Sequence, residues 1–384
     1  MPTTPERFLV PTSDGPGSGR ELREESLLSL PAPLQLSRRS TSLEYPPGSL
    51  LCGVDGGATK TVAVLFDPET GHAVAGEGGP SNPDAVGYAE AASSIQHAVR
   101  AALDHVDPER AAVVSAVLGV AGVDTEAGRD RLCREFDVSF LSRSLVVNDV
   151  VVAWASGHRA GPGVVAISGT GSNVFGVDER DECWRCGGWG HILGDEGSGY
   201  GVGLAALRTA IAFRDERGSW SSIIPLLLEY YGVSRIEDLK EIVYRDFSKA
   251  RIAGFSQHVA TAASEGDRTA RSIFRRAAQE LAKQVAVVVK RLRFDEVVPI
   301  SLVGSTFRAG PVFISPLQSA LARTAPHAHL FQSDVAPVAG AVWLSGRAAG
   351  LEYRLDGEGV QASIDRALRN VRSLVGSSTR HDRT

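Results

Sequence analysis

Cysteine is scarce in this chain of 384 residues, which contains only Cys52, Cys133, Cys183 and Cys186. Four thiols in such a length are too few for a disulfide scaffold, so a reducing compartment is the default expectation. The N-terminal region lacks the apolar core of a signal peptide, and no apolar run is long enough to span a bilayer. We therefore expect a soluble, cytoplasmic protein that does not act at a membrane.

An excess of positive charge is also missing. The chain has 40 Lys and Arg residues against 45 Asp and Glu residues, a formal net charge of −5. Nucleic-acid-binding proteins usually present a basic face, so we expect no nucleic-acid partner. Hydrophobic residues make up 43% of the chain, which is enough for a sizeable core. At roughly 150 residues per domain, the length suggests two domains.

One local pattern, strand, glycine turn, strand, occurs twice. Residues 51–55 and 61–67 are apolar or β-branched runs on either side of a glycine turn, which is typical of a hairpin. Residues 163–168 and 173–178 repeat this pattern around a second turn. The repetition suggests two related domains that face each other.

The domain limits follow from this repeat and from changes in composition. Residues 1–48 are rich in Pro, Ser, Arg and Glu and bury too little apolar surface to offset the entropy of ordering, so we expect a disordered N-terminal extension. The first domain is predicted over 49–162 and the second over 163–350. Residues 351–384 are polar and basic and are expected to form a tail with a frayed end.

Hydrophobic periodicity predicts the remaining elements. Further strands are expected at 72–77, 112–120, 144–148 and 298–303. Helices are expected at 89–103, 129–136, 203–213, 223–231, 236–244, 254–264, 267–293, 317–324, 336–350 and, as a short one, 363–374. The mixture places the chain in the α/β class.

The first glycine turn, which runs from Asp55 to Thr61, has the composition of a phosphate-binding turn. Glycines such as Gly57 let backbone N–H groups approach a phosphate closely. Thr59 and Thr61 add hydroxyls, Lys60 adds charge, and Asp55 at the strand end could hold Mg²⁺. The spacing is not that of a P-loop, and a plain hairpin turn remains the alternative.

The second turn has the same character. Gly169, Thr170 and Gly171 lie between Ser168 and Ser172 at the start of the second half. Two such turns facing each other would hold a polyphosphate from both sides, whereas the alternative is a second ordinary turn.

Asp149 directly follows the strand predicted at 144–148 and lies close to the expected domain boundary. A carboxylate at such a place can act as the general base of sugar phosphorylation, which otherwise needs Mg²⁺ and phosphate-binding donors. The alternative is an Asp that caps the following helix.

The stretch from Cys186 to Tyr200 is the most unusual part of the chain. Its glycine density excludes a simple helix or strand, and it carries Trp189, His191 and two carboxylates. A Trp ring that stacks on a sugar, beside carboxylates that bind hydroxyls, makes a carbohydrate site, and a tightly folded structural loop is the alternative. Cys183 and Cys186 offer too few ligands for zinc and do not open a helix as redox pairs do, so we interpret them as incidental.

A nucleotide base also has a candidate place. Gly304 ends the strand predicted at 298–303, and Gly340 lies on the helix expected at 336–350. A glycine-terminated strand beside a helix leaves room for adenine.

Together these motifs resemble the N-acetylglucosamine kinases and the wider BadF/BadG/BcrA/BcrD ATPase family of the actin-like sugar-kinase superfamily. The segments that carry the resemblance are Asp55–Lys60, Pro80–Asn82, Gly119–Gly122, Asn148–Asp149, Ser168–Asn173, Cys186–Tyr200, Tyr244–Phe247 and Ile252–Phe255. The resemblance implies two ribonuclease H-like domains around a central cleft that closes on ATP and a sugar.

The chemistry of the glycine turns and the resemblance together give expected roles to individual residues. Those expected to bind ATP are Gly57, Thr59, Lys60, Gly169, Thr170, Gly171, Ala253, Gly254 and Gly304. Those expected to bind the sugar are Asn82, Gly122, Asp149, Gly188, Trp189, Gly190 and Asp195. Asp149 would be the catalytic base, Asp55 the Mg²⁺ ligand, and a homodimer is one assembly open to the chain.

The implied reaction is ATP-dependent phosphorylation of N-acetylglucosamine at its 6-hydroxyl. Glucosamine is the alternative substrate, since Pro83 after Asn82 and the Val120–Gly122 turn depart from the family pattern near the sugar. Two other classes stay open: an ATPase that activates a partner enzyme, and a non-catalytic sugar sensor. A sensor would be expected to have lost the base or a phosphate turn, and the chain keeps both.

Overall fold

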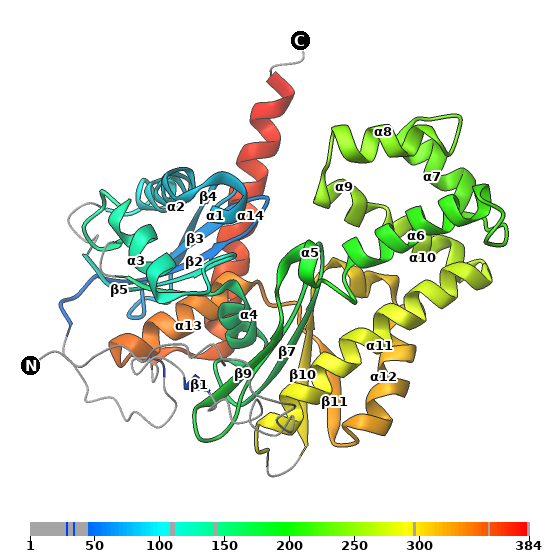
Figure 1. The fold of residues 1–384 in the computed structure, drawn as a ribbon. Coiled ribbons are helices and arrows are strands. Elements are labelled where there is room, and N and C mark those ends of the chain that lie inside the picture. The colour runs from blue at the N-terminus through cyan, green and yellow to red at the C-terminus, as the bar shows by residue number, and fades with distance from the viewer. Residues whose placement is uncertain are drawn as a thin grey trace, which may run out of the picture.

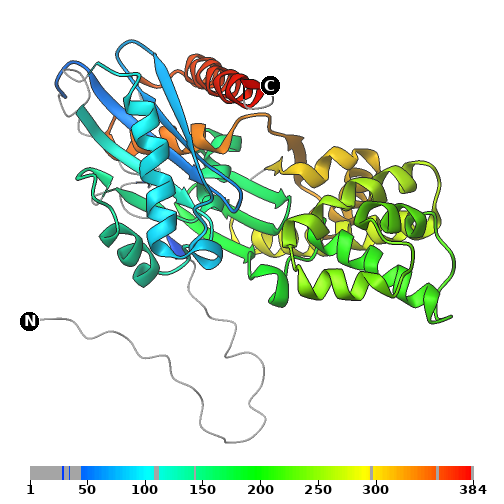
Figure 2. The same cartoon turned by 90° about the horizontal axis from the view of Figure 1, so that it is seen from above.

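The structure is a computed structural model that describes residues 28–29, 34, 45–107, 112–141, 144–294, 297–351 and 354–381. The chain forms two lobes, each built on one mixed sheet (Figure 1). Seen from above, the helices of the second lobe form the end of the molecule farthest from the first sheet (Figure 2). In the part of the chain that is described, no helix combines the length and apolarity needed to cross a membrane.

The first sheet has the strand order β4-β3-β2-β5-β6. Its strands are β2 (Ser49–Gly56), β3 (Thr61–Phe66), β4 (Ala73–Gly78), β5 (Ala112–Val120) and β6 (Leu145–Val147). The first three form an antiparallel meander, whereas β5 pairs parallel with β2 and β6 parallel with β5. The hairpin predicted at the start of the first domain is confirmed.

The second sheet repeats this arrangement, with the order β1-β9-β8-β7-β10-β11. Its strands are β7 (Gly163–Ser168), β8 (Ser172–Val177), β9 (Glu182–Gly187), β10 (Val298–Val303), β11 (Ala328–Gln332) and the two-residue β1 (Leu28–Ser29) at the edge. Again three antiparallel strands, β7 to β9, are joined by two parallel ones. The repeat expected from the two glycine turns is therefore a repeat of topology.

Two layers of helices cover the first sheet. On one face lie α1 (Pro83–Val86), α2 (Tyr88–Leu103) and α3 (Glu126–Arg134). The apolar face predicted for the helix at 89–103 is buried. On the other face lie α13 (Pro337–Ala349) and α14 (Gly357–His381). Val360 and Ile364 of α14 are buried in the apolar cluster on this face of the sheet. The expected tail at 351–384 thus contains a long helix that packs on the first lobe, where only a short helix was predicted.

The second lobe is mainly helical beyond its sheet. Its helices are α5 (Gly190–Leu193), α6 (Gly199–Arg214), α7 (Ile223–Tyr231), α8 (Asp238–Arg245), α9 (Lys249–Gly254), α10 (Ser256–Ser264), α11 (Arg268–Arg291), the 3₁₀ turn η5 (Ser305–Ala309) and α12 (Pro311–Thr324). The single helix predicted at 254–264 was wrong in one respect, because Gly254 ends α9 and buried Phe255 separates it from α10.

Helix α4 (Asp149–His158) crosses α13 between the two sheets (Figure 1). The helices touch through their backbones, since a Cβ added to Gly340 would lie 2.0 Å from the carbonyl oxygen of Val152. Gly340 is therefore a helix-packing residue, and the prediction that it borders a nucleotide base was wrong.

Leu34 is fully buried in the apolar cluster around α4 and α13. The Arg347 guanidinium donates a hydrogen bond to its carbonyl oxygen, at 3.3 Å. This residue and strand β1 fall in the segment 1–48 that was expected to be disordered, yet both contact the folded core. The remainder of that segment, apart from residues 45–48, lies outside the described residues.

Candidate active site

The first glycine turn closes between β2 and β3, where the Gly57 N–H donates to the Lys60 carbonyl oxygen at 3.0 Å. Thr59 and Lys60 are exposed. The Lys60 Nζ atom lies 2.7 Å from Glu77 Oε1 on β4, so an ion pair already neutralises this ammonium. The Lys60 side chain is thus directed back to the sheet. Thr59, by contrast, exposes its side chain at the tip of the turn.

Thr61 does not extend the turn toward a ligand. Its side chain is fully buried, and its hydroxyl lies 2.8 Å from both the Gly79 carbonyl oxygen and Ser81 Oγ. The hydroxyl that the sequence offered for phosphate binding is thus used to fix the base of the hairpin.

Two carboxylates, Asp55 and Asp149, interact electrostatically beside this turn. Burial raises the pKa of Asp55 to about 7, and the negative charge of Asp149 adds to the shift. Burial likewise raises the pKa of Asp149 to about 6. A divalent cation held by Asp55 would relieve this repulsion, because carboxylate oxygens are preferred ligands of such ions, and it would leave Asp149 available for another role.

The N-cap of α4 is Asn148, whose Oδ1 accepts from the Val150 N–H at 3.0 Å. Asp149 is the first residue inside the helix. The alternative interpretation of Asp149 as the capping residue was therefore wrong, because its neighbour has that role.

Asp124 and Arg185 complete the surroundings of Asp149, and the sequence had not singled out either residue. Asp124 accepts a hydrogen bond from Asn148 Nδ2 at 2.9 Å and forms an ion pair with Arg185 of β9. The Asp124 charge raises the pKa of Asp149 and the Arg185 charge lowers it. The Arg185 guanidinium also lies 5.9 Å from the ring centroid of Trp189.

Asn82 and Gly122 are adjacent. Asn82 caps α1 by accepting from the Asp84 N–H at 2.9 Å. Gly122 has a φ of +78°, and a Cβ there would lie 2.3 Å from Asn82 Oδ1. Pro83 opens α1, a position that suits its fixed φ and missing N–H, so its departure from the family pattern has a structural reason.

The second glycine turn rests on the segment that follows the Trp189 loop. The Gly169 N–H donates to the Gly171 carbonyl oxygen at 2.9 Å, and the Gly199 N–H donates to the Gly169 carbonyl oxygen at 2.8 Å. Asp195, which is 4% exposed, accepts from the Ser172 N–H through Oδ1 at 3.0 Å. Thr170 stands at the tip of this supported turn.

Asp195 has a second partner that the sequence interpretation missed. The Lys249 Nζ atom, from the start of α9, lies 2.7 Å from Asp195 Oδ2. Lys249 lies between two segments that carried the family resemblance, and that position was the only available signal.

Trp189 is 66% exposed and lies between two glycines with φ near +77° (Gly188, +76°; Gly190, +78°). A Cβ on Gly188 would lie 2.7 Å from Asn173 Nδ2, so the loop is held close to β8. The ring is therefore presented to solvent by a backbone that favours glycine on both sides.

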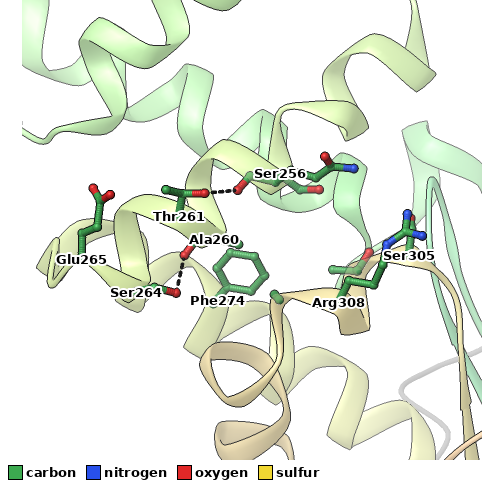
Figure 3. A pocket seen from close by; sticks show the side chains of 11 residues that line it. Ser256, Ala260, Thr261, Ser264, Glu265, Phe274, Ser305 and Arg308 are labelled. Carbon is green, nitrogen blue, oxygen red and sulfur yellow. Dashed lines mark hydrogen bonds between the residues drawn. The ribbon is translucent and has the colours of Figure 1, made fainter.

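A cavity of about 730 Å³ lies beside the second turn, between α10 and η5 (Figure 3). Ser256 and Thr261 line one side, Ser305 and Arg308 the other, and the Phe274 ring stands between them. The volume is in the range of small-molecule and cofactor sites.

Three residues, Ala253, Gly254 and Gly304, are predicted to lie near the nucleoside, and they have different neighbours in the structure. Gly304 has a φ of +121°, and a Cβ there would lie 2.3 Å from the Ser168 carbonyl oxygen. The Ala253 carbonyl oxygen would lie 3.3 Å from a Cβ on Gly199. Gly254 faces Tyr230, whose hydroxyl oxygen would lie 2.7 Å from a Cβ at Gly254.

The structure thus brings the predicted residues together in two groups. One contains the first turn with Asp55, Asp149, Asn82, Gly122 and, through Arg185, Trp189. The other contains the second turn with Asp195, Ala253 and Gly304, next to the cavity.

The cysteines do not form a further site among the described residues. Cys183 is buried, and burial raises the pKa of its thiol to about 12; the pKa of Cys186 is raised for the same reason. All four thiols are free, and no group of three or more His, Cys, Asp and Glu side chains is arranged to hold a metal in the described part of the chain.

Solved structures share this fold. A candidate N-acetylglucosamine kinase from Chromobacterium violaceum aligns with a TM-score of 0.65 at 23% identity and covers 78% of this chain and 99% of its own. A ROK family glucokinase from Streptomyces griseus, in complex with glucose and AMPPNP, aligns with a TM-score of 0.50 at 20% identity. The alignment covers 77% of this chain and 98% of the glucokinase. The predicted pair of ribonuclease H-like domains is confirmed at the level of the fold.

Curated relatives are similar in sequence as well. An N-acetylmuramic acid/N-acetylglucosamine kinase of Clostridium acetobutylicum is 31% identical over 244 residues, 62% of this chain and 79% of that protein. An N-acetyl-D-glucosamine kinase of Dictyostelium discoideum is 30% identical over 312 residues, 77% of this chain and 97% of that protein. Residues 52–345 match the family model as well, and the chain belongs to the BadF/BadG/BcrA/BcrD ATPase family.

Proposed function

We propose that this protein is an ATP-dependent amino-sugar kinase that phosphorylates N-acetylglucosamine at its 6-hydroxyl. The observation that carries the proposal is Asp149, a half-buried carboxylate that lies beside one glycine turn and is linked through Asp124 and Arg185 to the exposed Trp189 ring. The curated relatives with about 30% identity, named as N-acetylglucosamine kinases, support the same reaction.

Asp149 would act as the general base. Its carboxylate takes the proton of the sugar 6-hydroxyl while that oxygen attacks the γ-phosphorus, the bond to the bridging oxygen breaks, and ADP leaves. A pKa of about 6 leaves the carboxylate mostly ionised at neutral pH and still basic enough to accept a proton.

Asp55 would hold Mg²⁺, either directly or through water. Magnesium is commonly bound by one or two carboxylates together with substrate phosphates and water, which suits a single carboxylate beside a phosphate turn. When bound, the ion supplies charge that offsets the phosphate oxygens and keeps Asp55 ionised.

ATP would lie between the two glycine turns, with its phosphates at Gly57, Thr59, Gly169, Thr170 and Gly171. The cavity beside Gly304 would receive the adenosine, because its Thr306 hydroxyl donates to the Gly169 carbonyl oxygen at 3.3 Å and so joins the cavity to the second turn. Of the predicted nucleotide ligands, Lys60 has the weakest support, since Glu77 pairs with it.

The sugar would lie against Trp189 and its flanking glycines and reach Asn82 and Gly122. Asp124 is neutralised by Arg185, which favours an uncharged 2-acetamido group over an ammonium. Glucosamine stays the alternative because Asp84 Oδ2 would lie only 2.9 Å from a Cβ at Gly122, so a carboxylate is present near the predicted sugar residues.

A coupled assay of ADP release tests the function. N-acetylglucosamine, glucosamine, N-acetylmannosamine, N-acetylmuramic acid and glucose are compared, and N-acetylglucosamine is expected to give the highest kcat/KM. Asp149→Ala should lower kcat by roughly 10²–10⁴-fold while ATP still binds. The matched control is Asp137→Ala, an exposed carboxylate paired with Arg100. The absence of sugar-dependent turnover in the wild type would refute the proposal, and near-normal turnover of Asp149→Ala would remove Asp149 as the base.

The compartment and assembly remain predictions. Four free thiols and the use of ATP support a cytoplasmic protein, and a homodimer is the assembly to test.

A further inference from the structure

One buried ion pair lies under the second glycine turn. Asp195 is 4% exposed: its Oδ1 accepts from the Ser172 N–H at 3.0 Å, and its buried Oδ2 makes an ion pair with Lys249 Nζ at 2.7 Å and no further hydrogen bond within the described residues. The Lys249 side chain is 31% exposed, so a ligand can reach its ammonium.

The ammonium lies at the face of the turn itself. A Cβ added to Gly171 would be 3.3 Å from Lys249 Nζ and 2.7 Å from Asp195 Oδ1. Glycine at this position therefore leaves open a space that the ion pair borders. By contrast, Lys60 at the first turn is 47% exposed and is paired with Glu77 on the neighbouring strand, away from the turn's tip.

Phosphoryl transfer is favoured by positive charge beside the transferred group, because the three equatorial oxygens of that group carry negative charge in the transition state. The partly exposed Lys249 ammonium, at the rim of the predicted phosphate-binding turn, can meet that need. Its partner Asp195, in turn, is one of the residues expected to bind the sugar, and the Lys249 ammonium competes with a sugar hydroxyl for Oδ2.

We propose that Lys249 is a catalytic residue that leaves Asp195 to bind the γ-phosphate of ATP, and that this exchange frees Asp195 Oδ2 for a sugar hydroxyl. The proposal rests on the kinase function above. No bond is made or broken in the exchange: one ammonium moves between two anions. ATP therefore raises the affinity for the sugar, and by linkage the sugar raises the affinity for ATP.

The first test is turnover. Lys249→Met and Lys249→Gln both remove the charge, and Lys249→Gln keeps a donor for Asp195, which protects the fold if the methionine variant is unstable. Each is expected to lower kcat with N-acetylglucosamine about 100-fold, and Lys249→Arg should recover part of the loss. Lys283→Met, which removes an exposed lysine paired with Glu280, is the control and should match the wild type.

The second test separates a catalytic role from a merely structural one. Calorimetry measures the Kd of N-acetylglucosamine alone, with ADP, and with a β,γ-imido analogue of ATP. In the wild type the triphosphate analogue should tighten sugar binding more than ADP does. In Lys249→Met the sugar Kd should be the same in all three conditions, because Asp195 is free from the outset.

The outcomes distinguish this inference from the proposed function. A wild type without sugar-dependent turnover refutes the kinase. If the wild type is active, two results overturn the role of Lys249: turnover of Lys249→Gln within twofold of the wild type, or a nucleotide-dependent sugar affinity that persists in the folded Lys249→Met or Lys249→Gln protein.

Discussion

The pKa of Asp149 is raised by some of its neighbours and lowered by others. Burial and the charge of Asp124 raise its pKa to about 6, whereas the Val150 N–H and Arg185 lower it. The carboxylate must be ionised to accept a proton, so activity is lost as the pH falls through this pKa. Its neighbours thus decide the pH range in which the enzyme works.

Replacing Arg185 should move that range. In Arg185→Gln the stabilising positive charge is gone and Asp124 keeps its negative charge, so the pKa of Asp149 rises and the acid limb of kcat/KM shifts to higher pH. The measurement is a profile of kcat/KM from pH 5 to pH 9 for the wild type, Arg185→Gln and the surface control Arg100→Gln. An acid limb that stays in place in Arg185→Gln would show that Asp149 does not set it.

His158 makes a second pH-dependent contribution, this time to stability. Its Nε2–H donates to the Val164 carbonyl oxygen at 2.9 Å, and burial lowers the pKa of the ring from 6.5 to about 4. Between pH 6.5 and about pH 4, His158 is therefore protonated in the unfolded chain but neutral in the folded protein. The free energy of unfolding decreases as the pH falls through this window.

The His158→Gln variant should show a flatter profile. The contribution of His158 to the free energy of unfolding is on the order of 3 kcal/mol between pH 6.5 and pH 4, and glutamine, which does not titrate, removes it. Chemical denaturation at several pH values measures the effect, with His97→Gln, an exposed histidine, as the control. An unchanged slope between pH 6.5 and pH 4 in His158→Gln would contradict this assignment.

Helices α4 and α13 cross at a point where no side chain fits. Gly340→Ala would place a methyl group 2.0 Å from the Val152 carbonyl oxygen, so one of the helices must shift. We expect a loss of roughly 1–3 kcal/mol in unfolding free energy, measured by denaturant titration. In Gly359→Ala the nearest atom is the flexible Asp356 carboxylate, and stability should be preserved. Equal stability of the two variants would mean that the crossing tolerates the shift.

Elements with a clear apolar pattern were predictable from the sequence, including the edge strands β4 and β6 of the first sheet, whereas β9 and β11 of the second sheet were not. The hairpin of β2 and β3, the helix α2 and the long helix α11 each bury a regular apolar pattern. Strand β11 has only partly buried or exposed residues, and β9 has a single buried one, so neither has a pattern to detect. Their places are set by pairing with neighbours rather than by their own composition.

The candidate site was predictable to a similar extent. Motif residues such as Asp149, Gly169 and Trp189 could be found because glycine density and strand ends mark them. Lys249, Asp124 and Arg185 could not, because each matters only through a partner that is distant in sequence. Conversely, Thr61 belongs to the motif and yet its hydroxyl is bonded within the hairpin.

At the scale of the molecule, one apolar cluster joins the two lobes. It combines Val117 of the first sheet, Trp154 of α4, Phe175 of the second sheet and Leu344 of α13 around the buried Leu34. We propose that the second domain ends before α13, since α13 and α14 pack on the first sheet, although both lie beyond the second sheet in the sequence.

Leu34→Ala should weaken both lobes together. Truncating a fully buried leucine to alanine typically lowers the free energy of unfolding by about 2–5 kcal/mol. The cluster that contains Leu34 packs against both sheets, so both lobes should lose stability. Thermal unfolding followed by circular dichroism should show a single transition at lower Tm, whereas Val297→Ala at an exposed position should not change Tm. A Leu34→Ala protein as stable as the wild type would show that this segment is dispensable to the core.

Because the C-terminal helices α13 and α14 pack on the first sheet, a truncated first lobe lacks part of its own core. A fragment ending near residue 162 would expose the face of β2 and β3 that Val338, Trp343 and Ile364 cover, and would be prone to aggregation. The same fragment should become stable when a peptide spanning residues 337–371 is co-expressed. Fragment complementation in this protein therefore requires the first and last pieces of the chain, with the middle piece forming the other lobe.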